Sequence, residues 1–182
     1  MQPPLQIPKL VDHLFRHEAG KIVPVLTRLF GPSNLDLAED VVQDALVEAM
    51  EHWEYEGVPD NPAAWLHRVA RNKALNMLRR ENYQREYRSH ASRLFQSEML
   101  TETNLDQLFS EQEIQDDQLR MIFTCCHPSI STDSQIALAL KTLCGFSIPE
   151  IAKAFLTPEE NIRKRLTRAR QSIRDEIGRA HV

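Results

Sequence analysis

Positive charge is concentrated near the C-terminal end of this 182-residue sequence, where it could bind an anion. The segment from Leu156 to Asp175 is rich in Lys and Arg, although the whole chain has a net charge of −4. Arginine can form two hydrogen bonds with a guanine base, and both Lys and Arg bind phosphate groups. Such binding depends on a local patch of charge and not on the net charge. The segment is therefore a candidate nucleic-acid-binding element, and its cations are Arg163, Lys164, Arg165, Arg168, Arg170 and Arg174.

The apolar residues among these cations have helical spacing. At about 100° per residue, one helix face carries Ile162, Leu166, Ala169 and Ile173. The opposite face carries Lys164, Thr167, Arg168 and Gln171. Arg163 lies near the boundary, and Arg165 and Arg170 flank the apolar face. A buried apolar face behind an exposed cationic face is what a helix in the major groove of DNA requires. A basic surface helix without a ligand is the alternative.

Two capping boxes predict the structure in front of that helix. Ser147–Glu150 has the sequence SIPE and Thr157–Glu160 has the sequence TPEE. In each, the hydroxyl can accept the backbone amide three residues later, and the Glu can bond back to the amide of the capping residue. Pro158 suits a first helical position. The boxes predict a helix over Ile148–Phe155 and another from Pro158. The connection of about two or three residues is typical of a helix-turn-helix.

A second basic block precedes a stretch that contains no Lys or Arg. From Arg68 to Arg93 only Glu81 and Glu86 oppose the positive charge, whereas every charged side chain from Leu94 to Leu119 is acidic. Alternating blocks indicate two basic surfaces and an acidic connector. Solvated helix faces would explain either block alone, but two blocks on separate helical units favour polyanion binding.

The periodicity of the apolar residues predicts an all-α fold, because Gly is scarce and alternating strand patterns are absent. A first helix spans residues 10–30, with a kink or break expected at Gly20 or Pro24. Asp36 and Glu39 are a candidate capping pair for a second helix, and Asn61 is a candidate cap for a third. We predict two small helical domains joined by a flexible linker. The first spans residues 8–82, the acidic linker 83–115 and the helix-turn-helix domain 116–180.

Cys125, Cys126 and His127 raise the question of a metal or redox site. Adjacent cysteines lack the C-x-x-C spacing, and Cys144 is the remaining thiol. We expect Cys125 and Cys126 to pack as small hydrophobic side chains, His127 to end a helix, and no metal or cofactor to be bound. No nucleophile–base pair or Gly-rich phosphate loop is visible, so an enzyme is not favoured. A metal- or thiol-based redox protein that uses the CCHP segment remains an alternative.

The composition favours a cytoplasmic protein. No apolar run approaches the length of a membrane span. The N-terminal sequence MQPPLQIPKL lacks the apolar core of a signal peptide. An odd number of cysteines without a regular framework suits a reducing compartment.

The order of these segments resembles that of the extracytoplasmic-function (ECF) group of bacterial sigma factors. DLAEDVVQDALVEAMEHW resembles their region 2.2, NPAAWLHRVARNKALNMLRRE resembles regions 2.3 and 2.4, and LCGFSIPEIAKAFLTPEENIRKRLTRAR resembles region 4. DDQLRMIFTCCHPSI further resembles a subgroup that usually carries a C-terminal helical-repeat extension. Because this sequence ends at Val182, we expect that extension to be absent or removed.

The resemblance implies promoter-DNA sites on both domains. The positions in region 4 that match base-contacting residues for the minus-thirty-five element are Arg163, Lys164, Thr167 and Arg168. We expect Arg165 and Arg170 to contact phosphates. The loop Glu54–Asn61 matches the specificity loop for the minus-ten element, where Tyr55 could stack on a base; a packed Tyr is the alternative. We expect Trp65 to lie in the core. The positions expected to contact the minus-ten region are Tyr55, Asn61, Arg68, Arg71, Asn72, Lys73, Asn76, Arg79 and Arg80.

The resemblance also implies the core enzyme of RNA polymerase as a partner. Region 2.2 docks on the clamp helices of the largest subunit, and region 4 on the flap of the second-largest subunit. The matching polar face of region 2.2 consists of Asp40, Gln43, Asp44 and Glu48; a solvated acidic face is the alternative. An anti-sigma factor and a C-terminal extension of the chain itself are further candidate partners. We therefore predict a sigma factor that directs the core polymerase to promoters. A stand-alone helix-turn-helix regulator is the second hypothesis.

Overall fold

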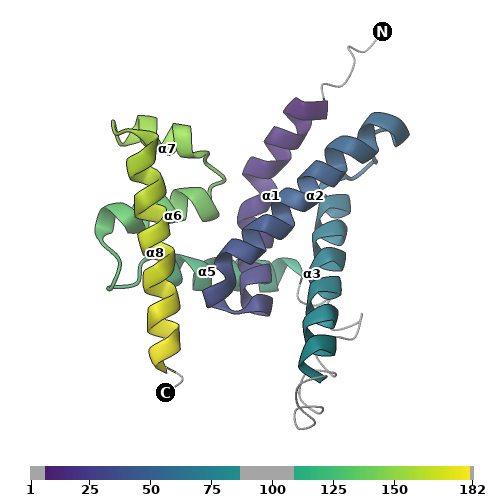
Figure 1. The fold of residues 1–182 in the computed structure, drawn as a ribbon. Coiled ribbons are helices and arrows are strands. Elements are labelled where there is room, and N and C mark those ends of the chain that lie inside the picture. The colour runs from purple at the N-terminus through teal and green to yellow at the C-terminus, as the bar shows by residue number, and fades with distance from the viewer. Residues whose placement is uncertain (1–6, 87–108, 181–182) are drawn as a thin grey trace.

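The computed structural model describes residues 7–86 and 109–180, except for the side chains of 81–86 and 177–180. Every regular element in those residues is a helix, which confirms the predicted all-α class. The first domain contains α1 (Ile7–Phe30), η1 (Pro32–Asn34), α2 (Leu35–Glu56) and α3 (Pro62–Glu86). The second contains α5 (Glu111–Cys125), α6 (Thr132–Thr142), α7 (Ile148–Ala154) and α8 (Glu159–Ala180). Figure 1 shows the two groups of helices side by side, with α5 crossing between them.

Helix α1 is continuous, so the expected break at Gly20 or Pro24 is wrong. Proline has no amide hydrogen for the carbonyl four residues earlier, which would normally be unpaired in the middle of a helix. Here that carbonyl belongs to Gly20, and it accepts a hydrogen bond of 2.9 Å from the side-chain amide of Gln118 on α5. Pro24 itself is buried in the core. A partner from the second domain therefore compensates for the proline.

Helix α2 begins without the predicted capping pair. Asn34 is its N-cap residue and makes no side-chain capping bond. The carboxylates of Asp36 and Glu39 are instead directed at cations of α8. The expected capping pair is thus wrong, because a stronger partner for both carboxylates comes from the other domain. The buried face of α2 ends in Trp53, whose ring packs edge-on against Trp65 of α3.

The predicted cap of α3 is confirmed. The side-chain oxygen of Asn61 accepts the amide of Ala64 at 3.0 Å. Helix α3 then continues to Glu86 and α5 begins at Glu111, so both ends of the expected linker over 83–115 are helical. At the start of α5 the hydroxyl of Ser110 accepts the amide of Glu113. The rest of the predicted linker lies outside the described residues.

The second domain contains the predicted helix-turn-helix, with one of its two capping boxes formed as expected. Ser147 and Glu150 exchange both bonds of the box at the start of α7. At the other site the hydroxyl of Thr157 accepts from the side chain of Asn161 at 3.0 Å, and Glu160 pairs with Lys164. The connection between α7 and α8 runs from Phe155 to Pro158, which is slightly longer than predicted.

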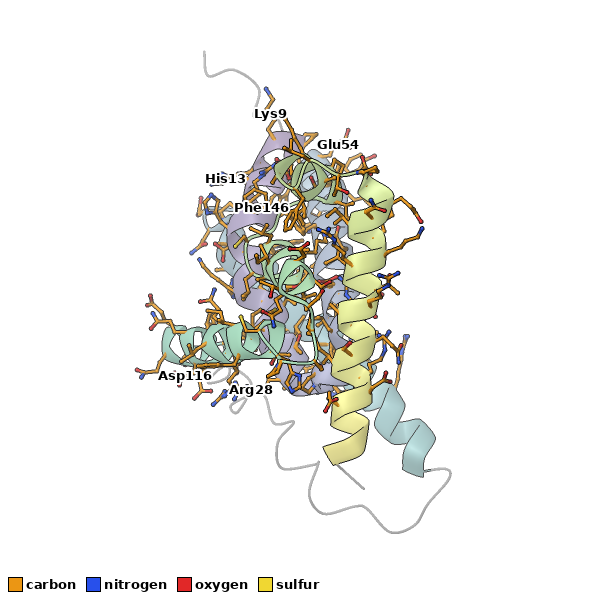
Figure 2. The ribbon with its side chains drawn as sticks, turned by 90° about the vertical axis from the view of Figure 1, so that its left-hand side faces the viewer. Lys9, His13, Arg28, Glu54, Asp116 and Phe146 are labelled. Carbon is orange, nitrogen blue, oxygen red and sulfur yellow. The ribbon has the colours of Figure 1, made fainter. Side chains whose placement is uncertain are left out.

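The two domains pack against each other and share a core. Buried residues of α1, α2 and α3 form one hydrophobic cluster with buried residues of α5, α6, α7 and α8. Helix α5 packs on α1, and α8 packs on η1 at the start of α2. Figure 2 shows α8 standing alongside the first domain and α5 projecting from it near Arg28 and Asp116. The described helices of the two predicted domains therefore contact each other in this structure.

Candidate nucleic-acid and polymerase interfaces

Helix α8 has the buried and exposed faces that its sequence predicts. Ile162, Leu166, Ala169 and Ile173 are all buried against α6 and α7. The exposed side carries the residues predicted to contact bases, with Gln171 in addition: Arg163, Lys164, Thr167 and Arg168. The apolar stripe thus fixes the rotation of the helix about its axis, and the rotation directs these side chains to solvent.

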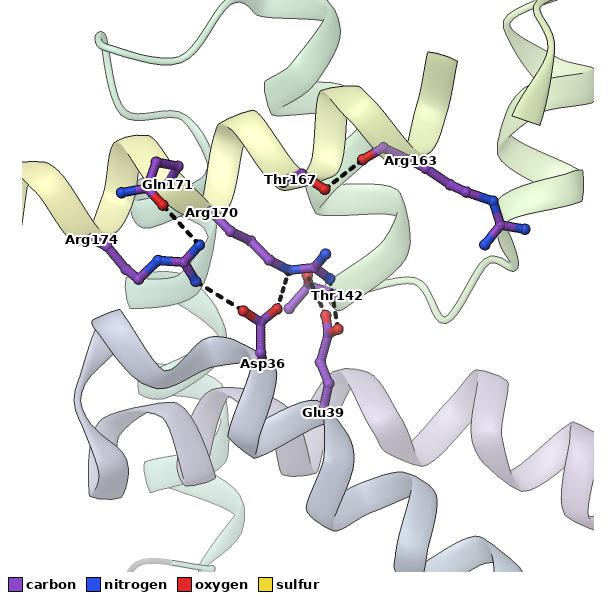
Figure 3. Close-up of polar contacts among 8 residues, drawn as sticks. All are labelled: Asp36, Glu39, Thr142, Arg163, Thr167, Arg170, Gln171 and Arg174. Atoms are coloured by element: carbon purple, nitrogen blue, oxygen red, sulfur yellow. Dashed lines mark hydrogen bonds and ion pairs between the residues drawn. The ribbon is translucent and has the colours of Figure 1, made fainter. Parts of the chain in front are cut away.

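Acidic residues in the first turn of α8 hold two of the exposed cations. Arg163 pairs with Glu159 at 3.0 Å, and Lys164 pairs with Glu160 at 3.5 Å. The hydroxyl of Thr167 donates to the carbonyl of Arg163 (Figure 3). Exposed ion pairs of this kind contribute little net free energy. DNA phosphates or bases can therefore replace the carboxylates at small cost.

Arg165, which was predicted to contact phosphate, lies between α6 and the turn of the helix-turn-helix. Its guanidinium forms an ion pair with Asp133 at 3.2 Å and stacks over the ring of Phe155 at 5.2 Å from the centroid. Only part of the side chain is exposed. In this position Arg165 fixes the turn relative to α8, and a phosphate contact remains a prediction.

Arg170, also predicted to contact phosphate, is directed at the first domain in this structure. Its guanidinium bonds Asp36 at 2.9 Å and Glu39 at 2.6 Å, and its side chain is 15% exposed. Glu39 also accepts from the hydroxyl of Thr142. Arg174 adds a second bond to Asp36 at 2.9 Å, and Figure 3 shows this group of contacts. Burial raises the pKa of Glu39, and the attraction of Arg170 opposes that rise.

Helix α3 presents most of its predicted DNA-binding residues to solvent. Those that are exposed are Arg68, Asn72, Asn76, Arg79 and Arg80. Arg71 is half-buried, and Lys73 pairs with Glu48 of α2 at 2.8 Å. At the end of α2, Tyr55 is 87% exposed, as a base-stacking residue would need to be. Trp65 is half-buried and its ring contacts those of Trp53 and His52. The prediction that Trp65 lies in the core is therefore confirmed only in part.

The predicted polymerase face of α2 is exposed and has an apolar part that the sequence analysis missed. Asp40, Gln43 and Asp44 are exposed, whereas Glu48 is half-buried beside Lys73. Val47 and Met50 are also exposed on this helix. Their spacing from Gln43 at four and seven residues places them on the same side of the helix, which is the signal that could have identified them.

The sequence analysis also missed an exposed apolar stripe on α5. Leu119, Ile122 and Phe123 are 52%, 46% and 70% exposed. Single exposed apolar residues are ordinary, but these have i, i+3 and i+4 spacing and so form one surface. The same spacing is visible in the sequence. The buried face of α5 contains Ile114, Asp117, Met121 and Cys125.

The buried thiol of the cysteine segment is poorly suited to redox chemistry. Cys125 is buried, as predicted, and burial raises the pKa of its thiol to about 12. Such a thiol is a poor nucleophile at neutral pH. Cys126 is exposed, so its expected packing is wrong. The ring of His127 bonds Ser129 just beyond the helix. Within residues 7–86 and 109–180, no three His, Cys, Asp or Glu side chains are grouped to hold a metal ion.

These features define a helical protein with a helix-turn-helix domain. Comparison with known families gives a more specific assignment. Residues 14–84 match the family model of sigma-70 region 2, and residues 120–173 match that of sigma-70 region 4. Together they cover more than half of the chain, which therefore belongs to the sigma-70 family, and the pair of regions is that of an ECF-type sigma factor. This family consists of non-enzymatic initiation factors.

A curated relative from Rhizobium meliloti (strain 1021), itself an uncharacterized protein, is 37% identical over 140 residues. The match covers 77% of this chain and 33% of the relative, so the chain spans about a third of that protein's length. Among the described residues no helix is both long enough and apolar enough to cross a membrane.

Proposed function

We propose that this chain is a specificity subunit that directs bacterial RNA polymerase core enzyme to promoters and assists initiation. The observation that best supports the proposal is the exposed side of α8, which carries Arg163, Lys164 and Arg168. This helix is the second of a helix-turn-helix whose first helix, α7, begins with a capping box. The chain's family, with both regions in order, supports the same function. Because polymerase and chromosome share the bacterial cytoplasm, we propose that compartment as its location.

Promoter recognition would divide between the two basic helices. In α8, an exposed Arg or Lys can bond base edges of the minus-thirty-five element in the major groove. In α3, Arg68, Arg79 and Arg80 can hold the DNA backbone at the minus-ten element, and Tyr55 can stack on an unpaired base. Base readout by α8 should determine sequence preference, whereas backbone contacts by α3 should set register and salt dependence.

Core binding would use α2. Its exposed carboxylates Asp40 and Asp44 suit a basic partner helix, and Val47 and Met50 beside them supply apolar contact. We propose the clamp helices of the largest subunit as that partner. Charge reversal at Asp40 and Asp44 should weaken holoenzyme assembly and leave helix content unchanged. Glu56→Lys is the matched control, because Glu56 is an exposed carboxylate on the same helix and lies more than about 100° around the helix axis from both Asp40 and Asp44.

The second core contact would use the apolar stripe of α5. Leu119, Ile122 and Phe123 form a surface that an apolar segment of a partner can cover. We propose the flap of the second-largest subunit as this partner. Phe123→Glu should reduce initiation at promoters that need the minus-thirty-five contact. Glu111→Gln, an exposed change in the first turn of α5, should not.

The function is tested by transcription in vitro with purified core enzyme on a promoter library. The proposal predicts initiation at a defined subset of sequences, dependent on both core enzyme and this chain. A stand-alone regulator would instead bind its operator tightly without core enzyme. Absence of any sequence-dependent initiation in the presence of core enzyme would contradict the proposal.

A further inference from the structure

A cleft lies where α1, α3 and the start of α5 meet. Its volume is about 570 Å³, within the range of about 300–1,000 Å³ that is typical of small-molecule sites. Figure 1 shows α5 reaching from the second group of helices to α3. The cleft is separate from the hollow beside Tyr55, which is lined by residues of α2 alone. Apart from Asn61, Arg68 and Arg71, the residues of its lining have no role in the function proposed above.

The floor of the cleft is polar, but its charge is balanced. Glu18 of α1 is buried, and each of its carboxylate oxygens already accepts a hydrogen bond. His67 donates to one oxygen at 2.9 Å, and Lys21 donates to the other at 3.0 Å. The bond from His67 lowers the pKa of Glu18, so the carboxyl group is ionised and forms an ion pair with Lys21. This group therefore neither requires a ligand cation nor strongly repels a ligand anion.

The wall formed by α3 supplies an excess of positive charge. Arg68 and Arg71 both line the cleft, and their spacing of three residues places them side by side on the helix. Arg68 is exposed and has no ion-pair partner among the described side chains. With Lys21, three cations of the lining face two carboxylates, those of Glu18 and Glu111. Two neighbouring guanidinium groups suit a carboxylate or phosphate, which they can bind with paired hydrogen bonds.

The opposite part of the cleft is apolar and has an aromatic side chain. Phe109, just before α5, is half-buried, and its ring packs edge-on against that of His67, with 6.1 Å between the ring centroids. Ile114 of α5 is buried beside it. Across the cleft, Ala63 and Ala64 of α3 have small side chains that leave room for a ligand. Such a surface suits a flat apolar ring, because aromatic rings pack favourably on one another and on aliphatic groups.

We propose that this cleft binds a small molecule that carries an anionic group on a flat apolar ring system. The anion lies at Arg68 and Arg71, and the ring lies against Phe109 between Ala64 and Ile114. Asn61 supplies a further polar contact at the rim, because its side-chain oxygen is used by the amide of Ala64 and its amide hydrogens remain available. Aromatic carboxylates and nucleoside monophosphates share this chemistry.

A ligand in the cleft would compete with promoter DNA for Arg68. We proposed above that Arg68 holds the DNA backbone at the minus-ten element, and a bound anion neutralises the same guanidinium. The ligand should therefore lower initiation. This consequence rests on the proposed function, whereas binding to the cleft does not.

Isothermal titration calorimetry of the purified full chain tests the site without polymerase or DNA. The probes are benzoate and adenosine 5′-monophosphate, each with its neutral counterpart, benzamide and adenosine. We expect at least one of the two anions to bind with a dissociation constant below about 1 mM, and its neutral counterpart to bind about tenfold more weakly. Inorganic phosphate, which lacks the ring, should also bind more weakly. The two anions distinguish a carboxylate ligand from a phosphate ligand.

Three substitutions locate the binding site of that probe. Arg71→Gln should weaken the anion about tenfold and leave the neutral counterpart unchanged, since only the charge-assisted bonds are lost. Phe109→Ala should weaken both molecules alike. Ala64→Leu should abolish binding, because it adds volume at an exposed position of the lining and leucine is a good helix former. Lys153→Gln is the matched control, because Lys153 is an exposed cation on α7 outside the cleft, and it should bind the probe as the wild type does.

Circular dichroism checks that every variant keeps its helices. Absence of saturable binding by both anions would overturn the proposal, as would equal affinity for the anion in the wild type and the folded Ala64→Leu chain. Transcription in vitro with core enzyme then tests competition at Arg68. Saturating probe should reduce initiation by the wild type and leave initiation by Ala64→Leu unchanged, and an equal response of the two chains would overturn the competition. A chain that supports no initiation even without the probe would refute the function proposed above, and calorimetry would still decide whether the cleft binds its ligand.

Discussion

The two basic helices of this chain differ in how their cations are held. Helix α3 turns Arg68, Arg79 and Arg80 out to solvent. Helix α8 has its cations in ion pairs along most of its length, first with its own carboxylates and then with those of α6 and α2. Both helices looked alike in the sequence, because both combine an apolar stripe with Lys and Arg.

The difference shows that the cations of a basic helix are not all equally available to bind DNA. The exposed cations Arg68, Arg79 and Arg80 of α3 can reach phosphate whenever the domain is folded. In α8, Arg163 and Lys164 can exchange their exposed carboxylate partners for DNA phosphates, whereas Arg170 must first separate from the half-buried carboxylate of Glu39. The predictions below test this contrast, beginning with the largest expected effect.

The largest effect should come from the apolar stripes that orient the two helices. Leu66 of α3 and Leu166 of α8 are both buried. Replacing either with Ala should lower the free energy of unfolding by about 2–5 kcal/mol, through lost burial and a residual cavity. Urea denaturation followed by circular dichroism measures the loss. Leu119→Ala, at an exposed site on α5, is the control and should change stability by no more than about 0.5 kcal/mol. An equally small loss at Leu166 would refute the packing of α8.

Substituting one arginine from each helix should then show the difference in pairing. Arg170→Ala leaves Glu39 without its guanidinium in a half-buried position, which should cost about 1–3 kcal/mol of stability. Arg68→Ala removes an exposed side chain and should change stability by no more than about 0.5 kcal/mol. Equal losses for the two variants, by the same denaturation assay, would remove the contrast between α3 and α8.

A smaller effect is expected at the turn between α7 and α8. Arg165→Ala removes an ion pair with Asp133 and a cation–π contact with Phe155. Together these should contribute about 1 kcal/mol to stability. Asp133→Ala removes the ion pair alone and should cost less. If Arg165→Ala leaves thermal stability unchanged but flattens the salt dependence of promoter binding, Arg165 acts on phosphate, as its sequence position first suggested.

An effect that depends on pH concerns Glu18 of α1. A hydrogen bond from His67 of α3 is the main reason that the pKa of Glu18 falls to about 2 from its usual 4.5. A carboxyl group with a lowered pKa stabilises the fold fully above pH 4.5, and that stability is lost as the pH falls toward 2. His67→Ala should therefore move acid unfolding to higher pH.

Circular dichroism during acid titration measures the shift. His52→Ala is the matched control, because His52 also pairs with a glutamate, Glu56, but on the surface. The account predicts a larger shift of the acid transition for His67→Ala than for His52→Ala. Equal shifts would show that the buried bond of Glu18 with His67 contributes no more to stability than the exposed pair of Glu56 with His52.

Local signals in the sequence predicted the helices and the side of α8 that faces solvent. The stripe Ile162–Ile173, the cap at Asn61 and the capping box at Ser147 all act over a few residues, so their consequences can be inferred without knowing the rest of the fold. The site residues on α8 and α3 followed from the same local pattern and from the family resemblance. Their contacts with DNA and polymerase remain predictions.

Long-range contacts explain what the sequence analysis missed. Asp36 and Glu39 had the spacing of a cap, but their partners are more than 100 residues away in the chain. Gly20 and Pro24 had the composition of a helix break, but Gln118 and Leu143 of the other domain explain both. The local sequence allows each of these residues either a role within its own helix or a contact with the other domain. Only the tertiary packing determines which role the residue has.

The most direct test of the account is a base-preference profile of holoenzymes that carry single substitutions in α8. Transcription from promoters varied at each upstream base would be compared for wild type, Lys164→Ala and Arg168→Ala, with Arg79→Ala of α3 as the backbone-contact reference. The account predicts that Lys164→Ala or Arg168→Ala relaxes preference at a particular upstream position by about 1–3 kcal/mol. Arg79→Ala should weaken initiation at all upstream sequences alike. Uniform loss for both α8 variants, with every base preference unchanged, would contradict the assignment of sequence readout to α8.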